Sequence, residues 1–260
     1  MENVINQVLH GAAIDLLKQI PEESVQLVLT DPPYNISGKK FDLLNNKTGG
    51  PWKRVNETWD EFKTSDEYLD FSTKWIDLCN RLLKPNGSIM ICCTHHNMAE
   101  IILPLKQLDY KFQNIITWRK SNPMPNVTKR MFTHSTEFVV WFTKGKNWIF
   151  NYEEMKKYNS GKQLRDVWEF PVLQGKERIK DEAGKPAHPT QKPLTLFTRL
   201  VEAATNKGNL ILDPFIGTGT TAEVAIKTNR KWIGIEQEER YVKIINERLN
   251  QIKDRSLEID

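Results

Sequence analysis

The chain has 260 residues, 39% of them hydrophobic, and a formal net charge of +4. This length and composition favour one large globular domain, with or without an insert, over a fibrous or disordered chain. No apolar run approaches the roughly 20 residues of a membrane helix, and the amino-terminal residues lack the pattern of a signal peptide. Cys79, Cys92 and Cys93 are typical of buried thiols in a reducing cytoplasm, where we expect the protein to reside.

The positive charge is concentrated in one part of the chain. Residues 111–187 hold 15 Lys and Arg against 8 Asp and Glu, an excess larger than the net charge of the whole protein. A local positive field of this kind suits a polyanionic partner. A solvated lysine-rich surface explains the same excess equally well.

Short apolar segments alternate with amphipathic ones along the chain. Apolar residues three to four positions apart predict helices over 66–83 and 239–252, and a further helix opens at Thr220. The segments with the composition of strands are 25–30, 88–92, 115–118, 138–142, 210–212 and 231–235. This alternation predicts an α/β fold with a mixed, mostly parallel sheet and helices on both faces.

Two segments interrupt the alternation. Residues 37–54 are polar, basic and glycine-containing, which is typical of a loop. Residues 145–185 have weak periodicity and many charges, so we expect an insert that lies outside the sheet and leaves 1–144 and 186–260 as the main domain. Four tryptophans are expected in the core: Trp118, Trp141, Trp148 and Trp168.

The histidines do not predict a metal site. His95 and His96 follow the strand 88–92 without the paired acidic or thiol spacing of metal ligands, so we interpret them as loop histidines near a pocket. His134, in the sequence FTHSTE, is expected to order a loop rather than to act as a base.

The sequence NLILDPFIGTGTTAEVAIKTNRKWIGIEQEER predicts a strand, a tight glycine turn, a helix and a second strand that ends in an acidic residue. Gly217 and Gly219 allow the positive φ and the close ligand approach that such a turn needs. Glu236 stands nineteen residues after Gly217, and at about this distance an acidic residue hydrogen-bonds ribose hydroxyls in nucleotide-binding βαβ units. We therefore expect a ligand that contains adenosine.

The same turn departs from the known phosphate-binding patterns. Ala222 stands at the third position of the dinucleotide fingerprint, and the turn has no Walker lysine. A dinucleotide oxidoreductase is therefore disfavoured. A ligand with ribose but no phosphate at the turn fits better, and S-adenosylmethionine is the obvious one.

The apolar segment 25–30 ends abruptly in Asp31-Pro32-Pro33-Tyr34, at the sheet edge where open parallel sheets bind ligands. An exocyclic amine of a nucleobase is a poor nucleophile, because its lone pair is delocalised into the ring. Two acceptors on its hydrogens would favour a pyramidal nitrogen, and Asp31 and the fixed carbonyl of Pro32 are candidates. Tyr34 offers a face on which the base can stack. The sulfonium methyl group is already activated, so placement and electrostatics would supply the catalysis.

DPPY and DPFIGTGTT together resemble the S-adenosylmethionine-dependent DNA amino-methyltransferases, specifically the beta group, whose catalytic motif precedes the cofactor motif. The resemblance covers nearly the whole chain and implies a circularly permuted Rossmann-like fold and base flipping. In that family Asp-Pro-Pro-Tyr usually accompanies adenine N6 chemistry, whereas serine in the first position is commoner for cytosine N4. ITWRKSNPMPN and FTHSTEFVVWF are similar to adenine methyltransferases of restriction–modification systems, including the second methylase of GATC-type systems.

The resemblance also assigns roles to residues. AHPTQKP is similar to the family segment that leads into the cofactor strand, which implies that Lys192 faces the methionine carboxylate. Ala12 is a departure, because the family often has an acidic residue there that contacts the cofactor adenine. The catalytic residues are expected to be Asp31, Pro32, Pro33 and Tyr34. The expected cofactor-binding residues are Asp31, Lys192, Asp213, Phe215, Gly217, Thr218, Gly219, Thr220, Thr221 and Glu236.

DNA contacts are expected between two strands of the basic segment. The cations would contact phosphates and the asparagines would read base edges; the residues are Arg119, Lys120, Asn122, Asn126, Lys129 and Arg130. Residues 145–185 are the candidate target-recognition region, and GATC as the recognition sequence is implied only by the resemblance of residues 115–170. A cognate restriction endonuclease is a further expected partner, and a homodimer is compatible with the family. Cytosine N4 methylation and a catalytically silent DNA-binding subunit are the alternatives.

Overall fold

The computed structural model describes residues 4–35, 60–126, 129–173, 177–180, 184, 187 and 191–257. The described strands form an 8-stranded sheet with the order β1-β8-β7-β2-β3-β5-β4-β6. They are β1 (Gln7–His10), β2 (Val25–Thr30), β3 (Leu83–Cys93), β4 (Lys111–Lys120), β5 (Thr136–Thr143), β6 (Val167–Phe170), β7 (Leu210–Asp213) and β8 (Lys231–Glu236). The loop expected over 37–54 lies outside the described residues.

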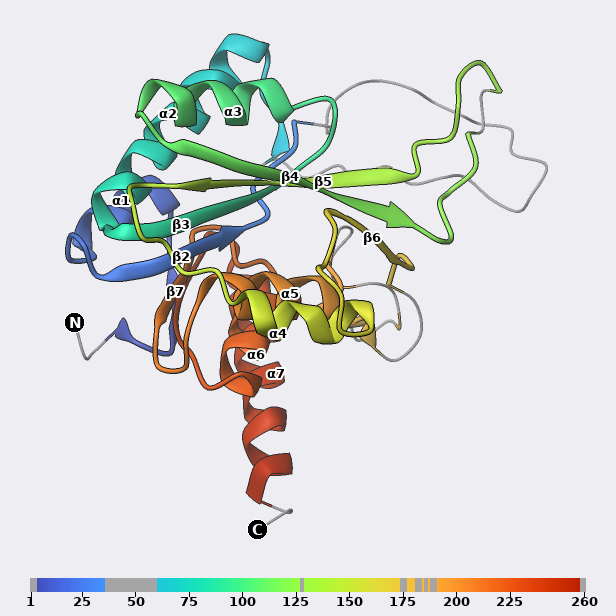
Figure 1. Cartoon of the computed structure of the whole chain (residues 1–260). Helices are drawn as coiled ribbons and strands as arrows, with labels where there is room; N and C mark the ends of the chain where they lie inside the picture. Colours follow the sequence, from blue (N-terminus) through green and yellow to red (C-terminus); the bar gives the residue numbers. More distant parts are fainter. Residues whose placement is uncertain are drawn as a thin grey trace.

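Helices cover both faces of this sheet (Figure 1). Helices α2 and α3 lie on one face, and α5, α6 and α7 lie on the other. The α-helices of the described residues are α1 (Ala13–Leu16), α2 (Ser65–Leu82), α3 (Met98–Gln107), α4 (Tyr152–Lys156), α5 (Leu194–Ala204), α6 (Thr220–Lys227) and α7 (Glu239–Leu257). The mixed α/β fold with helices on both faces, expected from the sequence, is confirmed.

The central strands are buried on both sides, which explains why they are continuous apolar runs rather than alternating ones. In β2, Leu27 and Leu29 pack with the helices of one face, whereas Val28 packs with the helices of the other. The same division applies to β3, where Met90 and Ile91 belong to opposite cores. The two hydrophobic cores therefore meet across β2 and β3, and they fix the edge at which both strands end.

One strand runs against the others. β5 is antiparallel to both of its neighbours, β3 and β4, while the remaining pairs in the described sheet are parallel. The amino end of an antiparallel strand lies at the carboxyl edge of its parallel neighbours. Residues at the start of β5 consequently share an edge with the residues that follow β2 and β3.

The sheet extends further than the sequence suggests. β6 pairs parallel with β4, and its side chains alternate between exposed and buried, with Trp168 and Phe170 in the core. The expectation that residues 145–185 lie outside the sheet is therefore wrong for Val167–Phe170, whereas their assignment as an inserted recognition region stays a prediction. Four residues of alternation are too short to stand out among so many charges. β3 is likewise longer than expected, because residues 84–87 continue the strand as an irregularity in its pairing with β2.

The expected tryptophans lie in the core or against it. Trp118, Trp141 and Trp168 are buried, and Trp148 is partly buried against the same cluster. None of the helices in the described residues combines the length and the apolar character that crossing a membrane requires.

Replacing Trp168 tests the place of β6 in the core. Trp168→Ala removes a large buried side chain and should lower the free energy of unfolding by about 3–5 kcal/mol. Its neighbour Val167 is exposed on the same strand, so Val167→Ala should change it by less than about 0.5 kcal/mol. Urea unfolding followed by circular dichroism measures both; equal effects of the two variants would place β6 outside the core.

Candidate active site

A cavity of about 390 Å³ opens at the carboxyl edge of the sheet, where β1, β2, β7 and β8 end. β2 and β7 are paired neighbours, with Leu27 opposite Ile211, so the residues after these strands come together. The wall contains Gly11 and Ala12 after β1, Asp31 to Tyr34 after β2, Asp213 to Thr218 from the last residue of β7 onward, and Glu236 to Glu238 from the last residue of β8 onward. The two sequence motifs therefore face one space, as their positions at strand ends predict.

The glycine turn forms the floor of this cavity. Gly217 and Gly219 have φ values of 56° and 85°, in the left-handed region that only glycine adopts easily. A side chain at Gly219 would also meet Ile245 of α7 at 3.3 Å. α6 begins directly after this turn, so its first N–H groups and its positive dipole end lie beside the cavity.

Glu236 is fixed below the turn by backbone donors. The N–H of Gly217 donates to one carboxylate oxygen (3.0 Å), and the N–H of Glu238 donates to the other (2.8 Å). Burial raises the pKa of the Glu236 carboxyl to about 7, although both hydrogen bonds favour the ionised form. A carboxylate keeps further lone pairs after accepting two bonds, and these are available to a ribose hydroxyl.

Asp213 joins three elements around the cavity. One of its oxygens accepts from the hydroxyl of Thr30 (2.7 Å) and from the N–H of Phe215 (3.1 Å). The hydroxyl of Thr221, in the first turn of α6, donates to the other oxygen. Burial raises the pKa of Asp213 to about 6. This carboxylate ties the ends of β2 and β7 to the start of α6, which fixes the geometry of the glycine turn.

The opposite wall carries a buried ion pair. The ammonium of Lys192 lies 2.6 Å from Asp31 and 3.6 Å from Glu137, the second residue of β5. Burial would lower the pKa of Lys192, but the two carboxylates hold it above its ordinary value. Burial also raises the pKa of Asp31, against the opposing effect of Lys192. The ammonium of Lys192 thus balances the charge of Asp31 at a buried position, where an ionised carboxylate without a cationic partner would be strongly disfavoured.

Glu137 links this pair to a second lysine. Its other oxygen lies 2.6 Å from the ammonium of Lys120, at the end of β4, and both side chains are 17% exposed. Burial alone would raise the pKa of Glu137, but Lys192 and Lys120 together lower it. Asp31, Lys192, Glu137 and Lys120 therefore form a row of alternating charges at the carboxyl edge of the sheet.

The Asp31–Tyr34 loop is held from behind by hydrogen bonds. The hydroxyl of Tyr34 donates to Asp31 (2.5 Å), and the backbone N–H of Tyr34 donates to Asp60 (2.5 Å). The hydroxyl of Tyr68, on α2, donates to the carbonyl of Pro33 (2.6 Å). Tyr34 is buried, with the ammonium of Lys192 5.0 Å from its ring centroid. A stacking role for Tyr34 stays a prediction.

The structure brings most of the expected cofactor residues together. All of them line the cavity except Gly219, which ends the turn beneath it. A contact between Lys192 and the methionine carboxylate stays a prediction, because the ammonium here pairs with Asp31. Ala12, the departure from the family pattern, also lies in the cavity wall.

Sequence reasoning missed two carboxylates of the site, Asp60 and Glu137. Glu137 carries a signal related to that of Asp31, because it is a charged residue that borders an apolar strand, although it stands at the start of its strand and Asp31 follows the end of β2. Asp60 follows a long polar segment and carries no such signal. Its role became visible only through the two N–H groups of Tyr34 and Asn35 that it accepts.

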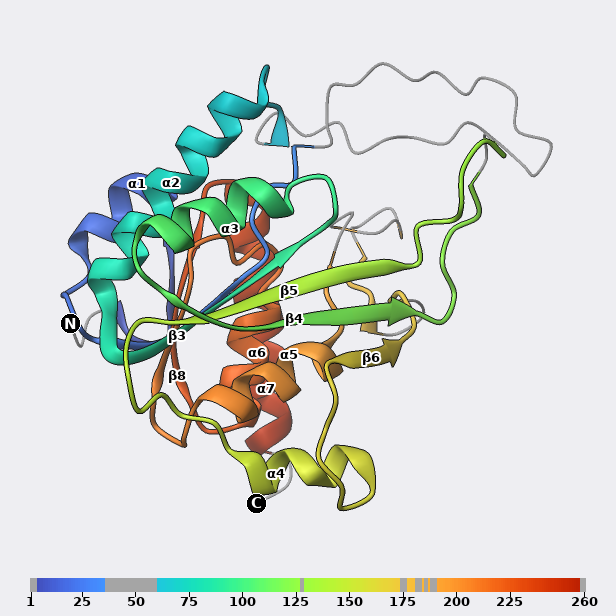
Figure 2. The same cartoon turned by 45° about the horizontal axis from the view of Figure 1, so that its top comes forward.

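The expected DNA-contact residues divide into two groups. Lys120 pairs with Glu137, and the amide of Asn122 exchanges hydrogen bonds with the backbone of Val172, so both have structural partners inside the protein. Lys129 and Arg130 are exposed on the connection between β4 and β5. Residues 121–126 and 129–135 of this connection extend beyond the helices and are called the arm below (Figure 2).

Comparison with known proteins identifies the fold and the family. The chain matches the family model described as DNA methylase, of the N6/N4 type, over residues 25–247. It is 39% identical over 255 residues to the type II methyltransferase M.HinfI of Haemophilus influenzae, covering 97% of this chain and 70% of that protein. It is 40% identical over 254 residues to the type II methyltransferase M2.LlaDCHI of Lactococcus lactis subsp. cremoris, covering 96% and 90%.

Solved structures agree with this assignment. The crystal structure of M1.HpyAVI with S-adenosylmethionine has a TM-score of 0.69 and 28% identity, covering 94% of this chain and 98% of that one. PvuII DNA methyltransferase, described as cytosine-N4-specific, has a TM-score of 0.72 at 22% identity, covering 92% and 84%, and shows the shared fold.

The fold and the cavity therefore define a Rossmann-like methyltransferase whose cofactor is S-adenosylmethionine. Within that class, the chain belongs to the N6/N4 DNA methylase family and is a DNA methyltransferase. The resemblance seen in DPPY and DPFIGTGTT is confirmed. The family includes both amino-group chemistries, so it does not choose between adenine and cytosine.

The raised pKa of Glu236 predicts a pH-dependent cofactor affinity. The acid loses its proton as the pH rises through about 7, and the ionised form is the stronger acceptor for the ribose hydroxyls of the cofactor. Affinity for S-adenosylmethionine should therefore be about tenfold lower at pH 6 than at pH 8, the ratio that this pKa gives. Calorimetric titration of the wild-type protein across this range measures it.

The matched variant is Glu236→Gln, which cannot titrate. It should bind about 10–100-fold more weakly at pH 8, as expected for a lost charge-assisted hydrogen bond, and its pH profile should lack the step that Glu236 causes. Because the variant retains any titration of the ligand itself, it serves as the control. A profile with the same slope in both proteins would remove Glu236 from the binding step.

The row of charges predicts strong coupling between Lys120 and Glu137. Glu137→Gln removes the carboxylate partner of Lys120, and Lys120→Gln leaves Glu137 only the more distant ammonium of Lys192 (3.6 Å), so each should lower the free energy of unfolding by about 2–4 kcal/mol. The double variant should lose less than the sum of the two, by about 1–3 kcal/mol. Urea unfolding of all four proteins gives the coupling energy, and strict additivity would contradict the pairing.

Proposed function

We propose that this protein transfers the methyl group of S-adenosylmethionine to the N6 amino group of adenine in DNA. The observation that carries this proposal is the position of Asp31, a carboxylate in the wall of the cofactor cavity beside the glycine turn. An ionised carboxylate is a stronger acceptor for an amine hydrogen than a neutral hydroxyl. The aspartate in the first position of the motif is also the form that accompanies adenine chemistry in the resembling family.

Asp31 retains the capacity to accept the target amine. One oxygen accepts from Tyr34 and the other from Lys192, and a carboxylate offers about four lone-pair sites in total. Two sites remain for the base. The carbonyl of Pro32 is the proposed second acceptor, because consecutive prolines fix its direction and Tyr68 holds the next carbonyl from behind.

The amine then attacks the sulfonium methyl group in one step. As the nitrogen forms its bond to carbon, the C–S bond breaks and its electron pair stays on sulfur, which becomes a neutral thioether. The nitrogen gains positive charge in this step, and the carboxylate of Asp31 stabilises that charge and is the group beside it that can take the released proton. The base must leave the duplex to reach the cavity, since a paired amine is inaccessible.

The relatives support a role in a restriction–modification system. Both curated relatives are type II methyltransferases, and they match nearly the whole chain. We therefore propose a modification enzyme that protects a specific sequence, with residues 145–185 and the arm as its recognition surfaces. The sequence GATC, a cognate endonuclease, a cytoplasmic location and a homodimer stay predictions.

Cytosine N4 methylation is the competing assignment. Its amine would present the same two hydrogens to Asp31, and the cytosine-N4-specific PvuII enzyme shares this fold. Transfer of label from S-adenosylmethionine to DNA, followed by digestion to nucleosides, separates the two. N6-methyladenine is the expected product, and N4-methylcytosine as the labelled nucleoside would overturn the base assignment.

Removing the Asp31 side chain tests the acceptor role. Asp31→Ala should reduce methyl transfer by more than about 1000-fold, while the affinity for S-adenosylmethionine stays within tenfold of wild type. Asp70, an exposed carboxylate on α2, provides the control, and Asp70→Ala should leave both quantities unchanged. An Asp31→Ala protein that binds cofactor and still methylates DNA at the wild-type rate would refute the mechanism.

A further inference from the structure

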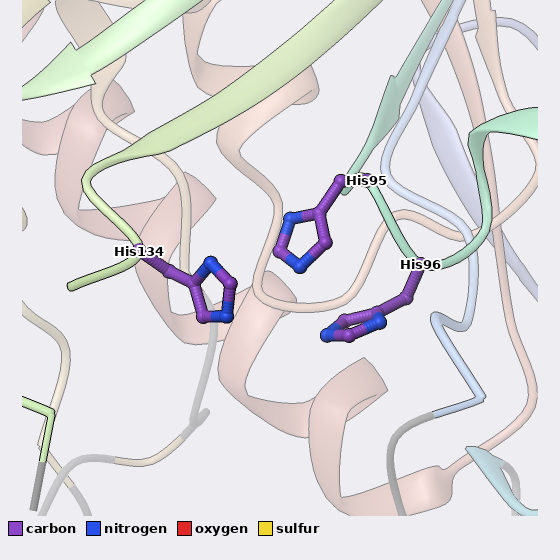
Figure 3. A group of neighbouring side chains, drawn as sticks. All are labelled: His95, His96 and His134. Atoms are coloured by element: carbon purple, nitrogen blue, oxygen red, sulfur yellow. The ribbon is translucent and has the colours of Figure 1, made fainter. Parts of the chain in front are cut away.

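Three histidines from two distant parts of the sequence meet at the surface of the protein (Figure 3). His95 and His96 follow β3, and His134 precedes β5. Each offers a ring nitrogen, and these three atoms lie within 4.8 Å of one another. The ring of His95 lies between the other two, with centroid distances of 4.0 Å to His96 and 4.2 Å to His134.

The strand pairing explains why these residues meet. β3 and β5 are antiparallel, and Cys93 at the end of β3 lies opposite Phe138 near the start of β5. The segment that follows β3 and the segment that precedes β5 therefore lie close together. The turn after β3 is closed by Asn97, whose side-chain oxygen accepts from the N–H of Thr94 (2.8 Å), so His95 and His96 stand on a defined turn.

The cluster is unfavourable as a group of cations. Protonated imidazoles this close would repel one another. Burial, together with His96 and His134, lowers the pKa of His95, which favours its neutral form. A neutral imidazole is the form that ligates a transition metal.

We propose that His95, His96 and His134 together bind a divalent transition-metal cation, with Zn²⁺ as the fitting ion. Imidazole nitrogens suit zinc, and three of them with one water complete a tetrahedral shell. Zinc–nitrogen bonds of about 2.0–2.1 Å place ligand atoms roughly 3.3 Å apart. All three side chains are exposed, so small rotamer changes can bring the nitrogens from within 4.8 Å to that spacing.

The position of the site gives the cation a structural task. His134 belongs to the arm, where Lys129 and Arg130 are predicted to contact DNA. On the other side, Asn97 donates to the hydroxyl of Tyr68 (2.9 Å), which donates in turn to the carbonyl of Pro33 in the catalytic loop. A cation shared by the two segments would fasten the arm to the turn that supports this loop. It takes no part in the methyl transfer.

The site itself does not rest on the proposed base or on the DNA contacts, so it can be tested by metal binding alone. Chelator-treated, tag-free full-length protein is titrated with Zn²⁺ in competition with a chromophoric chelator. One saturable site per chain is expected. His95→Ala and His134→Ala should each weaken it by more than about tenfold. His10 is an exposed histidine outside the cluster, and His10→Ala should bind as the wild type does.

Two further measurements keep the outcome decisive. Each variant is first shown to bind S-adenosylmethionine with wild-type affinity, so a loss of zinc binding does not reflect misfolding. Zn²⁺ should then slow amide hydrogen exchange in residues 129–135 of the wild type and leave it unchanged in His95→Ala. Absence of a saturable site in cofactor-competent wild-type protein, or equal zinc affinity in His134→Ala, would overturn the proposal.

Discussion

The buried ammonium of Lys192 is the group on which the catalytic edge of this protein depends. It lies between Asp31 and Glu137, two carboxylates that could not stay ionised side by side in a dry environment. With the lysine between them, the edge can hold an anionic acceptor directly against the cofactor cavity. Lys120 pairs with the other oxygen of Glu137 and so balances the second negative charge. The charge that the proposed mechanism requires of Asp31 is thus stabilised before any substrate binds.

The reversed strand β5 makes this arrangement possible. A fully parallel sheet would place the first residues of that strand at the opposite edge, away from Asp31. Because β5 is antiparallel, Glu137 and His134 reach the edge where β2 and β3 end. The same reversal therefore supplies a partner for Lys192 and the third imidazole of the histidine cluster. The arm between β4 and β5 also extends from this edge of the sheet (Figure 2).

The two halves of the cavity are built on different principles. On the cofactor side, Glu236 and Asp213 accept hydrogen bonds from backbone N–H groups and hydroxyls, and burial raises the pKa of each. On the catalytic side, Asp31 is balanced by a full positive charge. Neutral donors suit the proposed role of Glu236 in binding ribose hydroxyls, whereas an ammonium suits the proposed role of Asp31 beside a developing cation. One sheet edge therefore carries acidic residues with distinct tasks.

The sequence by itself determined the fold class, the cofactor turn and the position of Asp31, because each depends on local order along the chain. Apolar runs indicate buried strands, and the fixed spacing of Gly217, Gly219 and Glu236 indicates a nucleotide-binding turn. The structure alone decided that β6 joins the sheet, that Asp60 holds the catalytic loop, and that Glu137 pairs with Lys192. These contacts link residues far apart in the chain, and only the pairing and direction of strands bring such residues within bonding distance.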